Sequence, residues 1–279
     1  MRVLLVGGNS SLAQCLRPVL ADFAEVVTAG RNDCDLELDL NKITTIPSGF
    51  DSIVNTAAHL GGPNPAKLES AEATNVLGTL ALGRACAEAG ADHLVHISSI
   101  FATLPASSPF HNAYALSKRH GDEALQLQGR MQDMQLTILR PSQFYGVGES
   151  YRRNQPFLFT LMDRAQSAQN IELWGKHDAL RNFIHVQDVV NIIARVVLNR
   201  VLGTYTVSSP QNQSFHQIAQ AAVDAFESSS TIHFLHDKPD TADNIFPFQD
   251  TLYRTLGYTP QIDINRGMQM EAAHRRSTK

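Results

Sequence analysis

The stretch Met1-Arg2-Val3-Leu4-Leu5-Val6-Gly7-Gly8-Asn9-Ser10-Ser11-Leu12-Ala13 determines the fold class of this chain. Residues 2–6 form a short apolar run, which is typical of a strand buried on both faces of a parallel sheet. Two glycines end the run, and a helical pattern follows over residues 11–21. The stretch therefore predicts a strand, a tight turn and a helix, which is the first unit of an α/β fold.

The turn between this strand and this helix occupies the place of a glycine-rich dinucleotide loop. Such a loop lets the backbone approach a pyrophosphate, which then binds at the helix N-terminus. The pattern is degenerate, because Ser10 and Ala13 stand at the second and third glycine positions. A plain strand-to-helix turn fits the motif taken alone about as well. The residues predicted to line the cofactor here are Gly7, Asn9, Ser10, Ser11 and Leu12.

Strands and helices alternate along the next 130 residues, with connections of helix length. This alternation predicts an α/β fold with a doubly wound parallel sheet. Beyond Gly146 the pattern changes, a polar and Arg-rich segment at 148–155 resembles a mobile lid, and a smaller C-terminal α/β substrate-binding region is expected. The predicted division is 1–146 plus 183–200 for the cofactor-binding domain and 147–182 plus 201–279 for the substrate-binding region.

Composition excludes several classes of function. The chain has 279 residues and a net charge of -4, with no sign of binding to nucleic acid or membrane. Its three cysteines are scattered, which indicates reduced thiols and a cytoplasmic protein. Its eleven histidines show no metal-ligand spacing, so no metal site is predicted.

The pair Tyr114 and Lys118 is the strongest candidate for chemistry. Residues four apart on a helix share one face. An ammonium about 5 Å from a phenol, at an effective dielectric of about 20, favours the phenolate by about 3 kcal/mol, or roughly two pKa units. This argument predicts a lowered Tyr114 pKa and a general acid/base. Taken alone, the pair also fits an exposed helix on which the two residues fall together by chance.

Arg31 follows the second predicted strand, where NAD-binding domains carry an acidic residue for the ribose hydroxyls. A guanidinium suits a 2′-phosphate and a carboxylate would repel one, so Arg31 favours NADP over NAD. A solvated loop arginine is the alternative. Residues 36–40 alternate as in a strand, and Asp39 within this piece is placed to bond the adenine amine.

Other candidates stand at the ends of later strands, where ligands of parallel sheets bind. Ala57 and Ala58 are small enough for a cofactor to lie against the backbone. Ser98 and Ser99 end another predicted strand and are placed for chemistry.

Taken in order, these motifs resemble one family. They resemble the extended short-chain dehydrogenases/reductases, the NAD-dependent epimerase/dehydratase family that acts on nucleotide sugars. The matching elements are Gly7-Gly8, Asp39-Leu40, Ala57-Ala58, Asn75-Val-x-Gly78-Thr, Ser98-Ser99, Tyr114-x-x-x-Lys118, Arg140-Pro141, Tyr145-Gly146, Arg181-Asn-Phe-Ile-His-Val-Gln-Asp188 and Leu256-Gly-Tyr-x-Pro260.

The resemblance implies a Rossmann fold and a role for each matching residue. Tyr114 would exchange a proton with the sugar oxygen, Lys118 would hold the nicotinamide ribose, and Ser99 would bond the reacting oxygen, with Ser98 as neighbour or substitute. The family match adds Leu40, Asn75, Pro141 and Gln143 to the cofactor contacts. It places Asn154, Phe157 and Arg181 at the nucleotide of the substrate, and Arg181 suits diphosphate oxygens.

Departures from the family pattern narrow the reaction. Dehydratases of the family carry an Asp-Glu pair after the active hydroxyl residue, whereas Ile100 and Phe101 stand here, which argues against dehydration. Arg31 and Ser10 favour a 4-ketoreductase that exchanges NADP(H). The match from Arg181 to His185 favours the alternative, a 4-epimerase that retains NAD+. A non-enzymatic NADP-binding sensor or scaffold is a third hypothesis. The resemblance also implies a homodimer that pairs the helices at 75–89 and 114–128.

Overall fold

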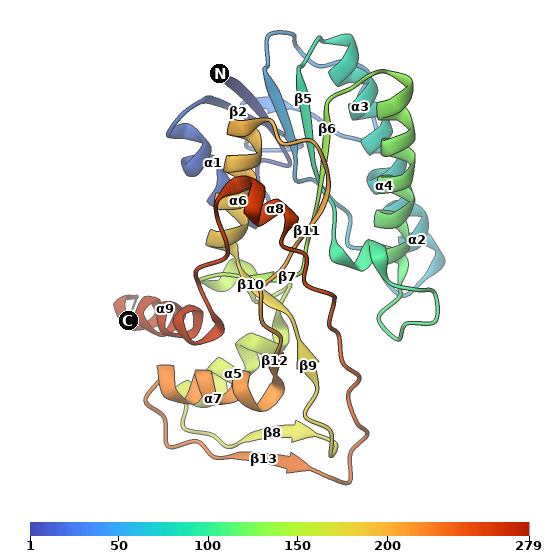
Figure 1. The fold of residues 1–279 in the computed structure, drawn as a ribbon. Coiled ribbons are helices and arrows are strands. Elements are labelled where there is room, and N and C mark those ends of the chain that lie inside the picture. Colours follow the sequence, from blue (N-terminus) through green and yellow to red (C-terminus); the bar gives the residue numbers. More distant parts are fainter. Residues whose placement is uncertain (279) are drawn as a thin grey trace. The chain divides into compact units, whose positions relative to one another are not determined.

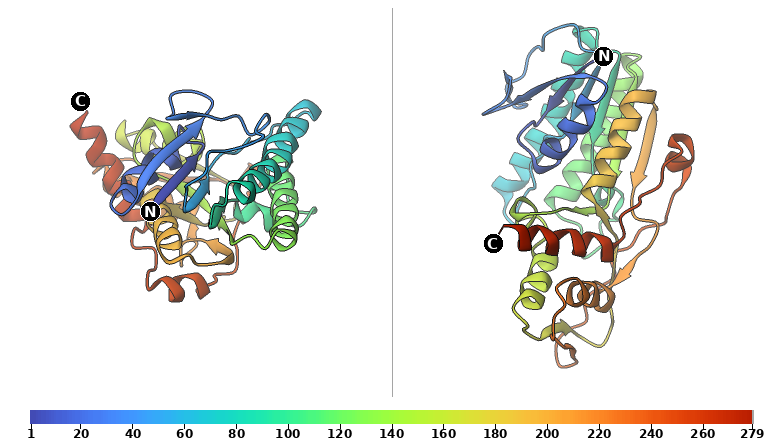
Figure 2. Two further views of the ribbon diagram at one scale, coloured as in Figure 1. Left: turned by 90° about the horizontal axis from the view of Figure 1, so that it is seen from above. Right: turned by 90° about the vertical axis from the view of Figure 1, so that its left-hand side faces the viewer.

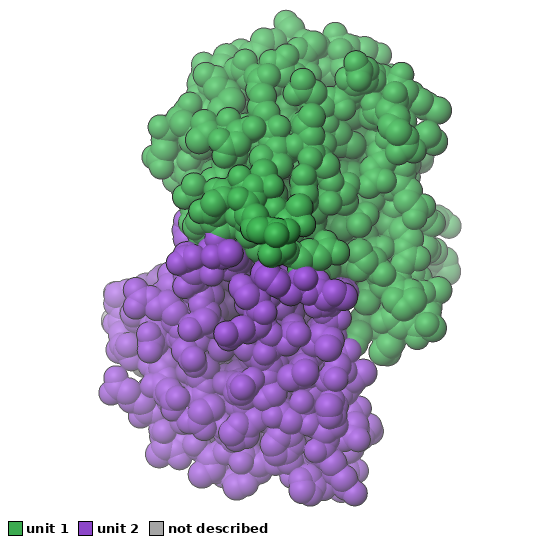
Figure 3. All heavy atoms as spheres, in the orientation of Figure 1, with its two compact units in different colours: residues 1–141, 190–207, 249–258 green, residues 142–189, 208–248, 259–279 purple. Residues whose placement is uncertain are grey.

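The computed structural model describes residues 1–278, which form two compact units. Unit 1 comprises Met1–Pro141, Val190–Val207 and Gln249–Tyr258. Unit 2 comprises Ser142–Val189, Ser208–Phe248 and Thr259–Lys279 (Figure 3).

A seven-stranded sheet, ordered β11-β6-β5-β4-β1-β2-β3, forms the centre of unit 1, and all its neighbouring strands are parallel. Helices cover both faces of the sheet (Figures 1 and 2). The prediction of a doubly wound parallel sheet is thus confirmed. The strands are β1 (Arg2–Val6), β2 (Glu25–Gly30), β3 (Leu36–Glu37), β4 (Ser52–Asn55), β5 (His93–Ile97), β6 (Leu136–Pro141) and β11 (Gly203–Val207).

One face carries α1 (Ser11–Ala21) and α6 (Val186–Asn199), and the other carries α2 (Pro65–Glu72), α3 (Thr79–Glu88) and α4 (Ala113–Met131) (Figure 1). A short helix, α8 (Thr251–Leu256), also belongs to unit 1. The apolar strand runs are buried because helices cover them from both sides, as in the core cluster that joins Leu4, Ile53, Leu94 and Ile138 to Leu82 and Leu125 of the helices.

Between α2 and α3 the chain forms a π-helical turn, η1 (Ala73–Gly78). Within this turn Asn75 is buried. Its side-chain oxygen accepts from the His59 N–H at 2.8 Å. Its side-chain nitrogen donates to the His59 carbonyl at 2.8 Å and to the Ser117 hydroxyl at 2.9 Å. The wider turn thus connects the loop after β4 to α4. π-helical turns are frequent at functional sites.

The predicted division of the chain differs from the two units at residues 142–146, 183–189, 201–207 and 249–258. Residues 201–207 are predicted in the substrate-binding region, but residues 203–207 form β11, which pairs with β6 over five residue pairs in the main sheet. The reason is that the edge of β6 offers unpaired backbone groups, which a parallel strand satisfies.

Within residues 142–189, 208–248 and 259–278, unit 2 contains three two-stranded sheets and three complete α-helices. Strand β7 (Gln143–Tyr145) pairs with β10 (Phe183–His185), β9 (Leu180–Arg181) with β12 (Gln213–Ser214), and β8 (Ile171–Trp174) with β13 (Ile232–Leu235). The helices are α5 (Pro156–Gln166), α7 (Phe215–Ala225) and α9 (Ile264–Ser277), and a short 3₁₀ turn, η3 (Glu149–Tyr151), precedes α5. Among residues 1–278, no helix has both the length and the hydropathy required to cross a bilayer.

Gly7 is required by the turn between β1 and α1. Its φ is +80°, and an added Cβ would lie 2.7 Å from the Ala57 nitrogen and 2.8 Å from the Thr56 hydroxyl oxygen. Gly90 has a similar φ of +69° but open space around its Cα. The two glycines therefore separate the cost of backbone conformation from the cost of a steric clash.

We predict that Gly7→Ala lowers the free energy of unfolding by more than Gly90→Ala does. Both variants carry the left-handed backbone cost of about 1–2 kcal/mol, and Gly7→Ala adds an overpacking cost of about 1–3 kcal/mol. Urea denaturation of the two variants and the parent measures the difference. Equal losses would show that the loop shifts away from the new methyl group without cost.

Candidate active site

Unit 1 brings Tyr114, Lys118 and Ser99 together. Helix α4 begins after Asn112, whose side chain accepts a hydrogen bond from the Ala115 N–H at 3.0 Å and so fixes the first turn. The Lys118 ammonium nitrogen lies 6.0 Å from the centre of the Tyr114 ring and donates to the Ile97 carbonyl at 2.8 Å. Ser99 is the second residue after β5 and faces Tyr114, whose pKa it lowers. Groups predicted from two separate parts of the sequence are therefore neighbours.

The Ser99 hydroxyl also caps a short helical turn. It accepts from the Phe101 N–H at 3.2 Å at the start of η2 (Ile100–Thr103). Arg119 of α4 donates to the carbonyls of Ala102 and Leu104, which ties this turn to the helix that carries Tyr114. The hydroxyl and the phenol are thus held by elements that are bonded to each other.

The expected lowering of the Tyr114 pKa is wrong for the protein as described. Burial raises the pKa of Tyr114 to about 12, and the hydrogen bond from Ser99 opposes that rise only in part. Burial likewise lowers the pKa of Lys118 to about 8, and the Asp122 carboxylate opposes this effect. At neutral pH, therefore, Tyr114 is a phenol and Lys118 is mostly an ammonium. The Coulomb argument omitted the desolvation of the phenolate, which outweighs the attraction.

Ser98 and Ser99 have different neighbours. The Ser98 hydroxyl lowers the pKa of the Asp122 carboxyl, so the two groups face each other. Neither the Ser98 Oγ nor the Asp122 Oδ1 has a hydrogen-bond partner of ordinary geometry within residues 1–278. Ser99 faces Tyr114. Consecutive residues of extended backbone point to opposite sides, which separates the two hydroxyls.

The carboxyl ends of the sheet also carry the residues predicted to hold a dinucleotide. Gly7 leaves room where a Cβ would collide with the loop after β4, as a cradle for a phosphate requires. The Ser10 hydroxyl does not face outward: it caps α1 by accepting from the Ala13 N–H at 3.1 Å and lies 3.0 Å from the Thr56 hydroxyl. Arg31 is exposed just after β2. The N-terminus of α1, with Ser11 and Leu12 in its first turn, remains a fitting place for a pyrophosphate.

The other predicted cofactor contacts differ in their surroundings. Asn9 donates to the Asn32 carbonyl at 2.5 Å, and the Asp39 carboxylate accepts from the Asn41 N–H at 3.0 Å. Leu40 is buried, Ala57 is partly exposed and Ala58 is exposed. Pro141 is buried at the end of β6. Gln143, by contrast, belongs to unit 2.

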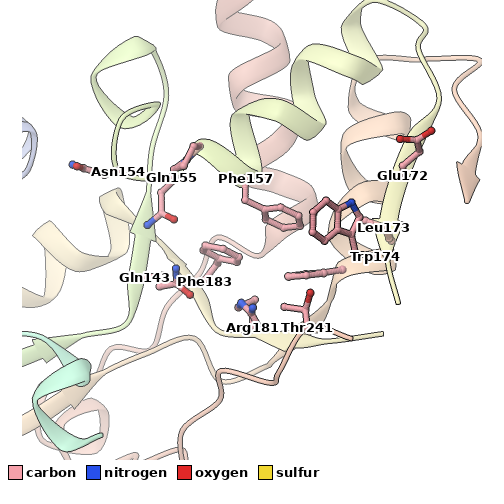
Figure 4. Close-up of a pocket in the computed structure, with 12 residues that line it drawn as sticks. Gln143, Asn154, Gln155, Phe157, Glu172, Leu173, Trp174, Arg181, Phe183 and Thr241 are labelled. Atoms are coloured by element: carbon pink, nitrogen blue, oxygen red, sulfur yellow. The ribbon is translucent and has the colours of Figure 1, made fainter. Parts of the chain in front are cut away.

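Unit 2 contains a pocket of about 470 Å³ (Figure 4). The predicted substrate residues Asn154, Phe157 and Arg181 line it, together with Gln143. Sequence reasoning missed several further residues of the lining. These are Gln155, Pro156, Glu172, Leu173, Trp174, Phe183, Phe215 and Thr241.

Aromatic rings and one guanidinium dominate this pocket. The rings of Phe157 and Phe215 lie 4.3 Å apart, and the Arg181 guanidinium lies 4.7 Å from the centre of the Phe215 ring. Arg181 also donates to the carbonyls of Leu180 and Ala242, both at 2.8 Å, which fixes its direction. Burial lowers the pKa of Arg181, but arginine stays charged. Trp174 is 56% exposed and lines the pocket. As the only tryptophan of the chain, it was a sequence signal for this pocket that the sequence analysis did not use.

The segment 148–155, expected as a mobile lid, is tied down by charged groups. Arg152 forms ion pairs with Glu149 and with Asp163 of α5, and Asp163 also pairs with Arg275 of α9. The buried Glu271 of α9 accepts from the Gly148 N–H at 2.7 Å. Asn154, which lines the pocket, follows within two residues of Arg152. The last helix thus holds the loop that leads into the pocket.

We predict that Arg152→Met increases amide hydrogen exchange in residues 149–154 by roughly 5–30-fold, which corresponds to a loss of about 1–2 kcal/mol from this ion network. Arg200→Met is the matched control, because Arg200 forms an exposed ion pair with Asp92 in unit 1. Exchange measured by mass spectrometry compares the two. Unchanged exchange in the Arg152 variant would mean that backbone contacts alone hold the segment.

The model of the NAD dependent epimerase/dehydratase family matches residues 12–207. A curated relative, CDP-abequose synthase of Salmonella typhimurium, is 23% identical over 242 residues, which cover 84% of this chain and 79% of the relative. A second, dTDP-4-dehydro-6-deoxy-D-allose reductase of Streptomyces bikiniensis, is 26% identical over 110 residues. These cover 39% of this chain and about a third (34%) of that protein.

Solved structures share the fold of the whole chain. The structure of RMD from Pseudomonas aeruginosa complexed with NADPH superposes with a TM-score of 0.77 at 19% identity, and the match covers 100% of this chain and 99% of that one.

Proposed function

Since this chain belongs to the NAD dependent epimerase/dehydratase family, a family of NAD-dependent enzymes, we propose that it is an NADPH-dependent 4-ketoreductase of nucleotide sugars. The observation that carries this proposal is the convergence of the Tyr114 phenol, the Lys118 ammonium nitrogen 6.0 Å from its ring centre, and the Ser99 hydroxyl. A bound nicotinamide would supply the hydride. The roles below are those of the chain's own groups.

Tyr114 is suited to give a proton rather than to take one. With a pKa of about 12 it is a phenol at neutral pH, so it can donate to a ketone oxygen that gains negative charge. Ser99 can donate a second hydrogen bond to that oxygen, and the Lys118 charge favours the phenolate that remains. An epimerase must begin by removing a proton from the sugar, which requires the phenolate at the outset.

Arg31 supports NADP as the preferred cofactor, with NAD as the alternative. Its guanidinium stands exposed at the end of β2, where it suits a 2′-phosphate. The phosphate cradle at Gly7 and the N-terminus of α1 fit either dinucleotide. Dehydration lacks support, because Ile100 and Phe101 follow Ser99 and carry no acid that could eliminate water.

The pocket of unit 2 supports a nucleoside diphosphate as the carrier of the sugar. Arg181 supplies charge for phosphate oxygens, and the rings of Phe157, Phe215 and Trp174 supply flat apolar surface for a base. The names of both curated relatives refer to nucleotide-linked sugars.

A homodimer is proposed because the family resemblance implies one and because the helices concerned expose apolar side chains. Leu77 of η1 and Leu127 and Met131 of α4 are exposed by 66%, 47% and 76%. These side chains offer apolar contacts for the helices at 75–89 and 114–128 of a second copy. With reduced cysteines, a cytoplasmic location is the expected setting.

We predict that the chain oxidises NADPH faster than NADH in the presence of 4-keto nucleotide sugars, and that Tyr114→Phe lowers kcat by about 10²–10⁴-fold because the proton donor is lost. Nicotinamide absorbance across a panel of 4-keto sugars measures both. Tyr205→Phe is the matched control, because Tyr205 lies on β11 and donates to the Leu202 carbonyl. Tightly retained NAD+ together with sugar epimerisation would contradict the reductase proposal and support the epimerase alternative. Full activity of Tyr114→Phe would contradict both.

We predict that UDP, dTDP or CDP quenches the fluorescence of Trp174, the only tryptophan of the chain, in a saturable manner. Arg181→Met weakens this binding by about 10–100-fold, since a charge-assisted hydrogen bond contributes about 1.5–3 kcal/mol. Arg195→Met is the control, because Arg195 also lies over an aromatic ring, that of Tyr258 in unit 1. The absence of quenching by every nucleoside diphosphate would contradict this use of the pocket.

A further inference from the structure

A buried carboxylate lies one helical turn beyond Lys118. Asp122 has no exposed surface and stands on the same face of α4 as Tyr114 and Lys118, because residues four apart are neighbours on a helix. No motif drew attention to this acid in the sequence.

Groups from three elements surround the Asp122 carboxylate. Arg140 of β6 donates from Nε to Oδ2 at 2.7 Å. Ser98, after β5, faces the carboxylate, and the Oδ1 atom has no hydrogen-bond partner within the described residues. Lys118 and Tyr114 complete the set from α4 itself. Arg140 therefore bonds only one oxygen of the Asp122 carboxylate, and part of the negative charge of the carboxylate remains to interact with Lys118.

Lys118 needs such a partner because its surroundings oppose its charge. Its side chain is 1% exposed, and its Nζ donates to the Ile97 carbonyl, an acceptor that carries no negative charge. Burial of an ammonium without a counter-charge favours the neutral amine. The buried His96 of β5 also opposes the ammonium when charged, but its own pKa lies well below the usual value through burial, so it is neutral.

We propose that Asp122, held by Arg140 and faced by Ser98, is a positioning residue that keeps Lys118 in its ammonium form beside Tyr114. The inference rests on the proposed function for its purpose, because Lys118 is the group that supports proton donation there. The electrostatics agree, because Asp122 raises the pKa of Lys118. Burial raises the pKa of Asp122, and the neighbouring groups Ser98, Arg140 and Lys118 lower the pKa of Asp122 again.

The test is the titration of Lys118 itself, followed by NMR of 13C-lysine-labelled protein, with Lys118→Arg to assign the signal. We expect Asp122→Asn to lower the Lys118 pKa by about one unit or more, as the loss of a nearby opposite charge does. Asp122→Glu is expected to restore the parent titration. Asp188→Asn is the control, since Asp188 is equally buried but accepts from the Gln261 and Ile262 N–H groups. An unchanged Lys118 titration in folded Asp122→Asn would overturn the proposal.

Ser98→Ala keeps the test decisive should Asp122→Asn fail to fold. Without the Ser98 hydroxyl, Asp122 protonates at higher pH, and the acid-side step in the Lys118 signal moves upward with it. A step that stays in place would overturn the proposal. Failure of the proposed function is separate: it would show as a parent protein that binds no NADPH, which leaves the Lys118 titration unaffected.

Discussion

The ammonium of Lys118 is held out of water, and much of unit 1 is arranged to tolerate it. A buried charge is costly unless it is paired and hydrogen-bonded. The Ile97 carbonyl at the end of β5 supplies the hydrogen bond, and Asp122 of α4 supplies the opposite charge. Asp122 in turn requires Arg140 from β6. The position of one side chain therefore constrains two strands and the longest helix of unit 1.

The fold was largely predictable because parallel strands buried on both faces leave short runs rich in apolar residues. Residues 2–6, 93–97 and 136–139 show this signal, and each lies in a central strand. Edge elements were less predictable. Alternation at 36–40 suggested a strand of five residues, yet only Leu36–Glu37 pairs, because β2 offers the partner groups for two residues alone. The π-helical turn at 73–78 depends on contacts of Asn75 with residues distant in sequence, which no local pattern reports.

The candidate site was predictable where spacing alone brings groups together. Tyr114 and Lys118 share a helix face whatever the rest of the chain does. The sign of the Tyr114 pKa shift was not predictable, because the Coulomb attraction to Lys118 can be written down from spacing but the desolvation of the phenol requires the surrounding atoms. The same holds for Asp122, whose partners Ser98 and Arg140 are 24 and 18 residues away in sequence and meet it only in the folded sheet. The lining of the pocket in unit 2 comes from six separate segments, and only the three matched by family motifs could be named.

The raised pKa of Tyr114 also bears on the direction of the proposed reaction. A group that must both remove and return a proton in one catalytic cycle works best with a pKa near the operating pH. The raised pKa of Tyr114 makes the phenolate rare at neutral pH. A one-way reductase begins with the phenol and is not limited by that rarity, whereas an epimerase begins with the scarce form. The buried position of Tyr114, which first looks like a defect of the site, is consistent with a group whose task is to donate. Asp122 then acts in two ways, since its charge favours the ammonium of Lys118 and disfavours the phenolate of Tyr114. In the proposed reductase, both effects would hold these protons until the substrate oxygen accepts one.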